Sequence, residues 1–376
     1  MKRFPVYLAL LLALLLTVSS CFSGDKPPVN TTDTVEITSQ VAQPDSTAPD
    51  DTSDAPDETS VTSDDTQETF PPIDLDFDPI ATDAEGNVAN PETTIRPLLY
   101  RVADTKGHQI WLFGSIHVGI LTMTELPPYI INAYKNASAL AVEVDTIEAQ
   151  QNESVMVNAL SRLVYTDGST IRDHISEELY QEAVAIFRLH QIYNPALDQY
   201  MPAFWSSMID SFLTENDQIS SNYGVDLTLL QKAKADRKSI ISIESALSQY
   251  QMMGDWSPAL QENLLASSVT SYKNPVAATY QLEQMLYAWC TGDAALLRDL
   301  SSDDAEDLDE TEKQLYEEYK KTMITDRDAK MTDFARDCLA EGKEVFICVG
   351  AAHVIGENGI VDRLTAEGYT VEIVQG

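Results

Sequence analysis

Two segments near opposite ends of the chain share one pattern, and this pattern restricts the fold more than any other feature. Residues 109–117 and 344–353 each contain a run of β-branched and aromatic residues, then Gly, two small or apolar residues and His. Short apolar runs that end at Gly are typical of buried strands. His117 and His353 would therefore follow the carboxyl ends of two strands, where open α/β sheets bind their ligands. The pattern predicts a sheet with two imidazoles at one rim.

Two further apolar runs lead into carboxylates. Residues 139–142 precede Glu143 and Asp145, and residues 239–243 precede Glu244. If these strands belong to the same parallel sheet, the carboxylates lie along the same edge as the two imidazoles. Such a group of side chains is typical of a divalent-metal site or an acid–base site.

Residues 1–20 resemble a bacterial lipoprotein signal. Residues 1–3 include two basic side chains, and residues 5–18 are apolar but short for a membrane span, which takes about 20 residues. The sequence Val18-Ser-Ser-Cys21 resembles a lipobox, in which the Cys is acylated and becomes the new N-terminus. We therefore expect a lipid on Cys21 that anchors the protein to the outside of the bacterial cell membrane. An ordinary secretory signal with an incidental Cys is the alternative.

Residues 21–95 are rich in Thr, Ser, Asp and Pro. Apolar residues are too sparse there to offset the entropy lost on ordering, so we expect a disordered, acidic linker. The whole chain carries a formal net charge of −36. This charge argues against a nucleic-acid partner, which needs a basic surface, and it suits an extracytoplasmic protein on a solvated tether. The folded domain is expected at residues 96–376.

The folded part has the pattern of an α/β domain. A hairpin followed by a helix and a strand predicts a βαβ unit with parallel strands. A long helical region and two final strands follow, so we expect a central mixed, mostly parallel sheet with a large helical insertion at about 150–340. The predicted elements are the hairpin strands 98–102 and 108–113, a helix at 124–136, a strand at 138–144, helices at 177–190, 202–213, 225–235, 275–289 and 315–323, and strands at 344–349 and 369–374.

A further helix is predicted to begin at Thr325, with Asp328 three residues later in an arrangement that resembles a capping box. Arg327 is unusual in a first helical turn because a cation opposes the positive end of the helix dipole. An acidic partner or an anionic substrate would explain it, and an indifferent surface position is the alternative. Arg327 is therefore a candidate site residue.

The motifs Gly114-Ser-Ile-His117 and Gly350-Ala-Ala-His353 resemble those of the TraB/GumN family, which includes the Tiki-type membrane metalloproteases. One Gly-x-x-His alone would be weak evidence, whereas two at strand ends with Glu143 between them are fairly specific. The resemblance covers about residues 96–376 and is most specific around His353. Further matching segments are Ala141-Val-Glu-Val-Asp145, Tyr223-Gly-Val-Asp226, Ile243-Glu244, Arg327-Asp-Ala-Lys-Met331 and Val349-Gly-Ala-Ala-His-Val-Ile-Gly-Glu-Asn-Gly359.

The resemblance implies an α/β core related to the erythromycin-esterase and haem-binding ChaN-like proteins. It also implies a divalent metal ion, such as Mn or Co, and peptide-bond hydrolysis as in the Tiki branch. Matched position by position, His117, Glu143 and His353 are the implied site residues. Arg327 matches the family's Arg-Asn pair, but the second residue here is Asp328. The hydrogen-bonding role of that second residue therefore does not carry over directly.

The function predicted from these residues is metal-assisted hydrolysis of a peptide or another small substrate. His117 and His353 would ligate the metal, with Glu143 as third ligand or general base, which leaves an open position for water as in catalytic zinc sites. The metal, Mn, Co or Zn, would lower the pKa of that water. Glu244 would orient a His by a hydrogen bond, and Arg327 would stabilise the developing oxyanion.

Three alternatives stay open for the same side chains. They could hydrolyse an ester by acid–base chemistry without a metal. A lipoprotein that binds a peptide, haem or metal without turnover would also use them, and the two His could instead cap strand-end turns. Ser115 lacks a Gly-x-Ser-x-Gly elbow, and the chain has no His-Glu-x-x-His segment, so a serine hydrolase and an ordinary zincin are disfavoured.

Overall fold

The structure is a computed structural model, and it describes residues 95–215, 218–301 and 308–374. The predicted signal peptide, Cys21 and all of the predicted linker except its last residue lie outside the described residues. Within the described part of the chain, no helix combines the length and apolar character needed to cross a bilayer.

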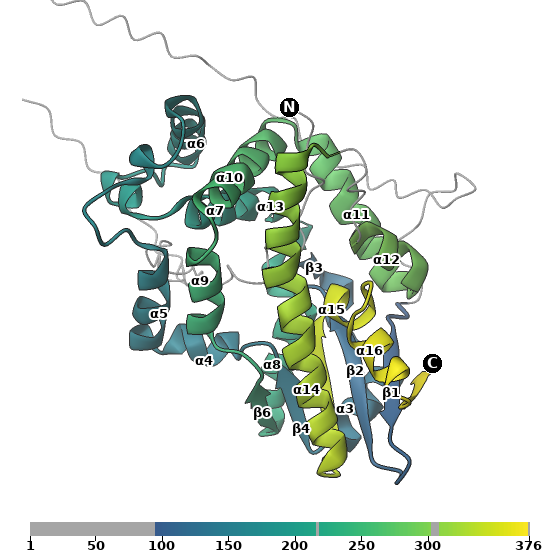
Figure 1. The fold of residues 1–376 in the computed structure, drawn as a ribbon. Coiled ribbons are helices and arrows are strands. Elements are labelled where there is room, and N and C mark those ends of the chain that lie inside the picture. The colour runs from purple at the N-terminus through teal and green to yellow at the C-terminus, as the bar shows by residue number, and fades with distance from the viewer. Residues whose placement is uncertain (1–94, 216–217, 302–307, 375–376) are drawn as a thin grey trace, which may run out of the picture. The chain divides into compact units, whose positions relative to one another are not determined.

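Six strands form one sheet in the order β6-β4-β7-β2-β1-β8 (Figure 1). β2, β7, β4 and β6 are mutually parallel, whereas β1 is antiparallel to both of its neighbours, β2 and β8. The predicted hairpin and the mixed, mostly parallel α/β sheet are thus confirmed. The strands are β1 Leu99–Ala103, β2 Gln109–Ser115, β4 Ala139–Val142, β6 Ser239–Ser242, β7 Val345–Gly350 and β8 Thr370–Ile373, and a separate pair is formed by β3 Gly119–Ile120 and β5 Ile219–Ser220.

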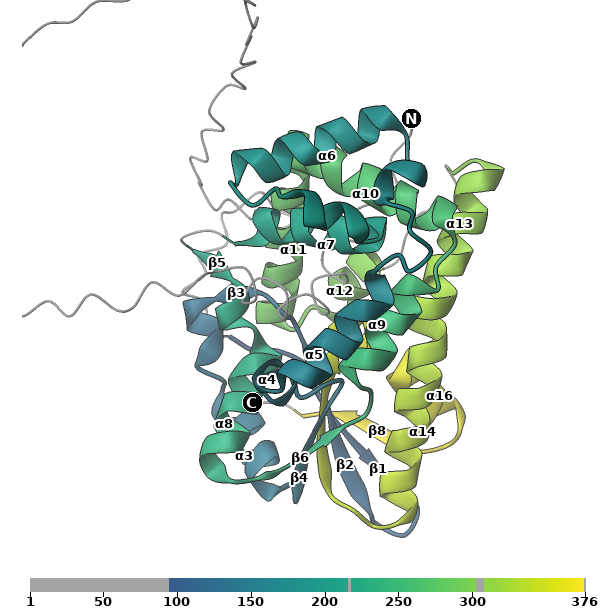
Figure 2. The same ribbon diagram turned by 90° about the vertical axis from the view of Figure 1, so that its left-hand side faces the viewer.

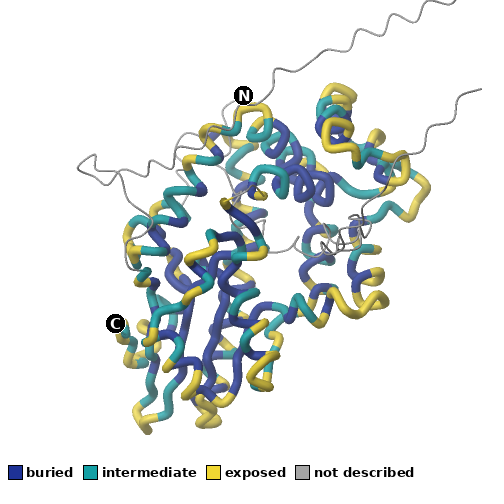
Figure 3. Tube along the Cα trace, turned by 180° about the vertical axis from the view of Figure 1, so that it is seen from behind, coloured by how far each residue is buried: buried dark blue, intermediate teal, exposed yellow. Residues whose placement is uncertain are grey.

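The central strands are buried on both faces. Every residue of β4 and β7 is buried, as expected for continuous apolar runs in a parallel sheet that helices cover on both sides. Helices α3 (Pro128–Asn136) and α8 (Val225–Asp236) lie on one face, and α14 (Asp326–Ala340) and α16 (Ile360–Ala366) lie on the other (Figure 2). Figure 3 shows the strands as mostly buried, with exposed residues gathered on loops and outer helix faces.

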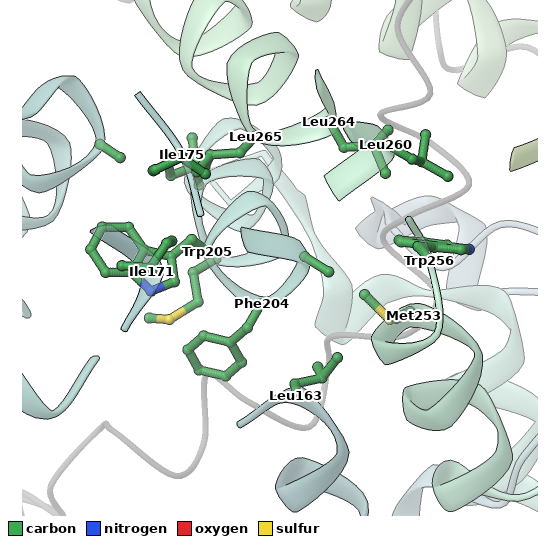
Figure 4. Packing of buried hydrophobic residues seen from close by; sticks show 14 of the residues in the cluster. Leu163, Ile171, Ile175, Phe204, Trp205, Met253, Trp256, Leu260, Leu264 and Leu265 are labelled. Carbon is green, nitrogen blue, oxygen red and sulfur yellow. The ribbon is translucent and has the colours of Figure 1, made fainter. Parts of the chain in front are cut away.

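Helices inserted before and after β6 build a second hydrophobic cluster. Phe204, Trp205 and Trp256 are all buried in this cluster, so these aromatic residues pack as core (Figure 4). Ser176 accepts a hydrogen bond from Leu179 N and caps α6. The inserted helices are α4 Thr146–Gln151, α5 Glu153–Leu160, α6 Glu177–Leu189, α7 Pro202–Thr214, α8, α9 Ala246–Gly254, α10 Pro258–Lys273, α11 Pro275–Thr291, α12 Ala294–Ser301 and α13 Glu310–Lys320.

The helix predicted to begin at Thr325 does not begin there. Asp309 caps α13 in a capping box with Glu312, and the chain continues through a π-helical segment, Lys321–Thr325, directly into α14. Thr325 has helical φ and ψ of −62° and −47° and makes no capping hydrogen bond. Because the helix began earlier, Arg327 lies in the interior of a continuous helix and does not oppose a helix N-terminus.

Candidate functional site

Four parallel strands end at one rim of the sheet and bring the predicted residues together. The register pairs Ser115 of β2 with Gly350 of β7, and Val142 of β4 with Cys348 of β7 and Ser242 of β6. The residues that follow these strand ends therefore meet at the same edge, as the sequence predicted.

Arg327 is the centre of this group, and its guanidinium is almost fully buried. Its Nε donates to Glu244 at 3.0 Å, and its Nη2 donates to Glu143 at 2.5 Å and to Glu244 at 2.8 Å. Nη1 contacts the Met323 carbonyl at 3.4 Å and lies 3.0 Å from Nε2 of His353. Burial would lower the pKa of Arg327, but the two carboxylates raise it above its usual value. All five N–H groups of the guanidinium can thus be assigned to partners.

Glu143 is held on both carboxylate oxygens. Oε1 accepts the Gly350 N–H at 2.7 Å, and Oε2 accepts from Arg327. Burial would raise the pKa of Glu143, but Arg327, the imidazoles of His353 and His117, and the Gly350 N–H hold it well below its usual range. Glu143 is therefore ionised at neutral pH.

His353 is enclosed in the short helix α15, Ala351–Ile355, and is only 1% exposed. Its Nδ1 lies 2.7 Å from Oδ1 of Asp328, and its Nε2 faces Arg327. Because Arg327 can only donate, Nε2 accepts and Nδ1 carries the proton that is donated to Asp328. The Asp328 carboxylate oxygen accepts this bond, a role that an amide oxygen could also fill. Burial raises the pKa of Asp328, and His353 opposes that effect.

His117 has a different partner, Asp226, which sequence reasoning did not assign to the site. His117 Nδ1 lies 3.0 Å from Asp226 Oδ2, at ion-pair distance but without the alignment of a hydrogen bond. Burial would lower the pKa of His117, but the Asp226 carboxylate raises it above its usual value. The signal was present in the matching segment Tyr223-Gly-Val-Asp226. A Cβ on Gly224 would lie 2.5 Å from the His117 carbonyl, so this Gly lets α8 start directly against His117.

Gly350 marks the point at which the three predicted residues converge. A Cβ built there would lie 3.3 Å from Glu143 Oε1, 3.5 Å from His353 Cδ2 and 3.8 Å from His117 Nε2. Because Gly350 has no side chain, the Glu143 carboxylate and the imidazoles of His117 and His353 can all come within 4 Å of one point, the position that its Cβ would take. We refer to it as the Gly350 space.

A small pocket lies next to this space and shares Glu143 and His117 as walls. Asp226 and Ser115 extend into it, and Gly350 and His353 are not among its lining residues. Three buried polar atoms on its wall have no aligned hydrogen-bond partner in the described structure: Ser115 Oγ, His117 Nδ1 and Asp226 Oδ1. The full lining is Ser115, His117, Val142, Glu143, Val144, Thr146, Asp226, Gln249 and Cys348.

Two predicted carboxylates have other roles in this arrangement. Glu244 accepts hydrogen bonds from Arg327 and from Gln249 Nε2, not from an imidazole. Asp145 caps α4 by accepting from Glu148 N at 3.0 Å and pairs with Lys234 at 2.5 Å. Asp145 therefore belongs to the helix start next to the site.

The residues as arranged do not fit a three-ligand metal centre. Within residues 95–215, 218–301 and 308–374, no three His, Cys, Asp or Glu side chains are placed to hold one ion. Both nitrogens of His353 and both oxygens of Glu143 are engaged, which leaves His117 Nε2 as the available predicted ligand. A metal at this rim would require Glu143 to part from Arg327, so the Mn, Co or Zn ion stays a prediction.

Comparisons with known proteins agree with the motifs. The chain is 31% identical over 143 residues to the uncharacterized protein YbaP of Escherichia coli strain K12, and equally to that of Shigella flexneri. This alignment covers 38% of the chain, and the chain spans half the length of these relatives. No solved structure matches. Residues 98–373 match the TraB/PrgY/gumN family, which takes in nearly all of the described residues. The chain therefore belongs to the TraB/PrgY/gumN family.

Proposed function

We propose that the protein is a hydrolase that acts on peptide bonds, with His117 and Glu143 as its reactive pair. The observation that carries this proposal is the Gly350 space, the point at which an imidazole nitrogen of His117 and an ionised carboxylate oxygen of Glu143 converge to within 4 Å. A water molecule between them would have an acceptor on each side, which is the arrangement that general-base catalysis requires.

In the proposed reaction, neutral His117 accepts a proton from that water at Nε2. The resulting hydroxide attacks the carbonyl carbon of the scissile bond, and the imidazolium returns the proton to the leaving amine. Asp226, beside Nδ1, stabilises the imidazolium, as a buried carboxylate does in triad-type sites. Glu143 adds a second fixed negative charge and orients the water.

Arg327 acts on this reaction through its neighbours. Its N–H groups are engaged by Glu244, Glu143, Met323 and His353, so a direct bond to an oxyanion would require one of these contacts to open. In the present arrangement Arg327 keeps Glu143 ionised and fixed in place. The predicted oxyanion contact of Arg327 stays a prediction.

The proposal places this activity outside the cell membrane, on a domain tethered through a lipid on Cys21. The apolar segment before Val18-Ser-Ser-Cys21 and the acidic linker after it support this location. Labelling with a radioactive fatty acid would test the anchor, because the Cys21→Ser variant should lose the label and leave the membrane fraction. Label that persists on Cys21→Ser would contradict it.

The decisive experiment is hydrolysis of a fluorogenic peptide library by the purified protein. We expect cleavage that falls by about 10²-fold or more in His117→Ala and in Glu143→Gln. Loss of cleavage on chelation, with recovery on adding Mn²⁺, Co²⁺ or Zn²⁺, would support the metal-dependent form, and cleavage that resists chelation would support the residues acting alone. Peptide that binds and stays intact would overturn the hydrolase and support a binding lipoprotein.

A further inference from the structure

The pocket beside the Gly350 space has more hydrogen-bond acceptors than donors. Ser115 is 2% exposed and Asp226 is 7% exposed, yet Ser115 Oγ and Asp226 Oδ1 have no aligned partner in the described part of the chain. The Ser115 hydroxyl interacts with the thiol of Cys348, which is a weak hydrogen-bond partner and has a pKa that burial raises well above its usual value. Buried polar groups rarely remain unpaired, so these atoms point to a missing donor.

The charges around the pocket indicate what kind of donor is missing. Two carboxylates, those of Glu143 and Asp226, line the pocket, and two more, those of Glu244 and Asp328, pair with Arg327 and His353 outside its lining. The guanidinium of Arg327 lies against Glu143 and Glu244, and the imidazole of His117, whose pKa the Asp226 carboxylate raises, is a second positive group at the pocket wall. Lys234 from α8 is already paired with Asp145. A buried excess of negative charge favours a cationic ligand.

The pocket has room for about one water-sized group, which matches a primary ammonium. An ammonium offers three N–H donors, one each for Asp226 Oδ1, Ser115 Oγ and a Glu143 oxygen. Building on the proposed hydrolase, we propose that this pocket binds the primary ammonium group of the substrate. An amine seated there would place the adjoining part of the substrate at the Gly350 space, because the pocket and that space share Glu143 and His117 as walls.

A binding experiment tests this inference without requiring turnover. The ligands are alaninamide, which mimics a peptide N-terminus, butylammonium, which mimics a Lys side chain, and N-acetyl-alaninamide as the uncharged control. Binding to the purified full chain is followed by calorimetry and by the NMR signals of His117. We expect at least one amine to bind about tenfold or more tightly than the acetylated control, and the better amine identifies the source.

Variants separate this site from a general effect of charge. Ser115→Ala should weaken binding of the amine about tenfold and leave the acetylated control unchanged. Asp226→Asn should weaken it at least as much, whereas Ser138→Ala, which removes a hydroxyl bonded to Glu344 O at the opposite end of β4, should have no effect. Equal binding of amine and acetylated control would overturn the inference, as would Mn²⁺ that occupies the pocket and is not displaced by the amine. Amine binding without hydrolysis would uphold it while refuting the proposed function.

Discussion

The two Gly-x-x-His motifs have the same spacing but different surroundings. His117 follows β2, lies beside Asp226 and borders both the pocket and the Gly350 space. His353 lies in α15, is enclosed, and has both ring nitrogens engaged by Asp328 and Arg327. Spacing therefore determines where each imidazole stands, whereas its partners determine what it can do. We assign the reactive role to His117 and regard His353 as a positioning residue that holds Arg327.

We expect the largest effect from replacing Arg327, which contacts both Glu143 and His353. Arg327→Met removes the cation between Glu143 and Glu244 and leaves buried carboxylates unpaired, so we expect the free energy of unfolding to fall by about 3–5 kcal/mol. Urea unfolding followed by tryptophan fluorescence measures it. The loss should be smaller at acidic pH, because without Arg327 the pKa of Glu143 rises and the carboxyl is protonated more easily.

A matched control is Arg172→Met, at an exposed Arg that pairs with Glu177 at 3.0 Å. Exposed pairs contribute little, so we expect a loss below about 1 kcal/mol. If Arg327→Met destabilised the protein no more than Arg172→Met, Arg327 would not be the centre of the buried group.

The two imidazoles should differ most clearly in stability. His353→Ala leaves the buried carboxylate of Asp328 and one N–H of Arg327 without a partner, so we expect a loss of about 2–4 kcal/mol. His117→Ala removes no aligned hydrogen bond, and its side chain is 11% exposed, so we expect a loss of about 1 kcal/mol. Thermal unfolding of the two variants side by side gives the comparison. Equal losses would mean that the two motifs carry equivalent roles.

Substitution by Ala should affect the Gly of each motif differently: Gly114→Ala should mainly reduce stability, and Gly350→Ala should mainly reduce activity. A Cβ on Gly114 would lie 2.9 Å from Ala351 Cα and 3.1 Å from Ala351 Cβ, so Gly114→Ala must shift backbone and should cost about 1–3 kcal/mol. Gly350 has φ of −50°, which Ala adopts readily, and its nearest neighbour would be 3.3 Å away. Gly350→Ala requires the Glu143 carboxylate to give way by only a few tenths of an ångström, so it should cost no more than about 1 kcal/mol, while its methyl group occupies the Gly350 space.

Peptide cleavage completes this comparison. Because the added methyl group displaces the attacking water, we expect Gly350→Ala to lose about 10²-fold in kcat/KM although it stays folded. Gly114→Ala should retain more activity per folded molecule. Full activity in Gly350→Ala would rule out the Gly350 space as the reaction site.

The sequence was sufficient to predict the rim of the sheet. Apolar runs that end at Gly or at a carboxylate are local signals, and parallel strands share one edge, so His117, Glu143 and His353 could be placed together before any coordinates. Each of these positions depends on a strand only four to seven residues long, for which pattern and structure agree.

The partners of these residues depended on contacts that no local pattern contains. Asp226 reaches His117 from α8, after a long run of inserted helices, and the close approach of Gly224 to His117 helps to fix that contact. Asp328 fits a capping box with Thr325 by spacing, yet its side chain bonds His353 because the helix had already begun at the Asp309 cap. Tertiary contacts outcompeted a weak local signal in both cases.

The smallest expected effect, and the sharpest test of the division of roles, concerns the charge beside each imidazole. Asp226→Asn keeps the shape of the side chain but removes the charge that raises the pKa of His117, so that pKa should fall. Imidazole NMR titration measures it. Because the folded-state pKa of His117 is raised, its contribution to stability is full below about pH 6.5 and is lost as the pH rises through the folded-state value. The stability difference between wild type and Asp226→Asn should therefore shrink from pH 6 to pH 9.

Asp328→Asn is the control, because its amide oxygen still accepts the Nδ1 proton of His353 and the unfolding free energy should change by less than about 1 kcal/mol. If Asp226→Asn left the titration of His117 unchanged, Asp226 would not set the charge of His117, and the two motifs would lose the feature that distinguishes them.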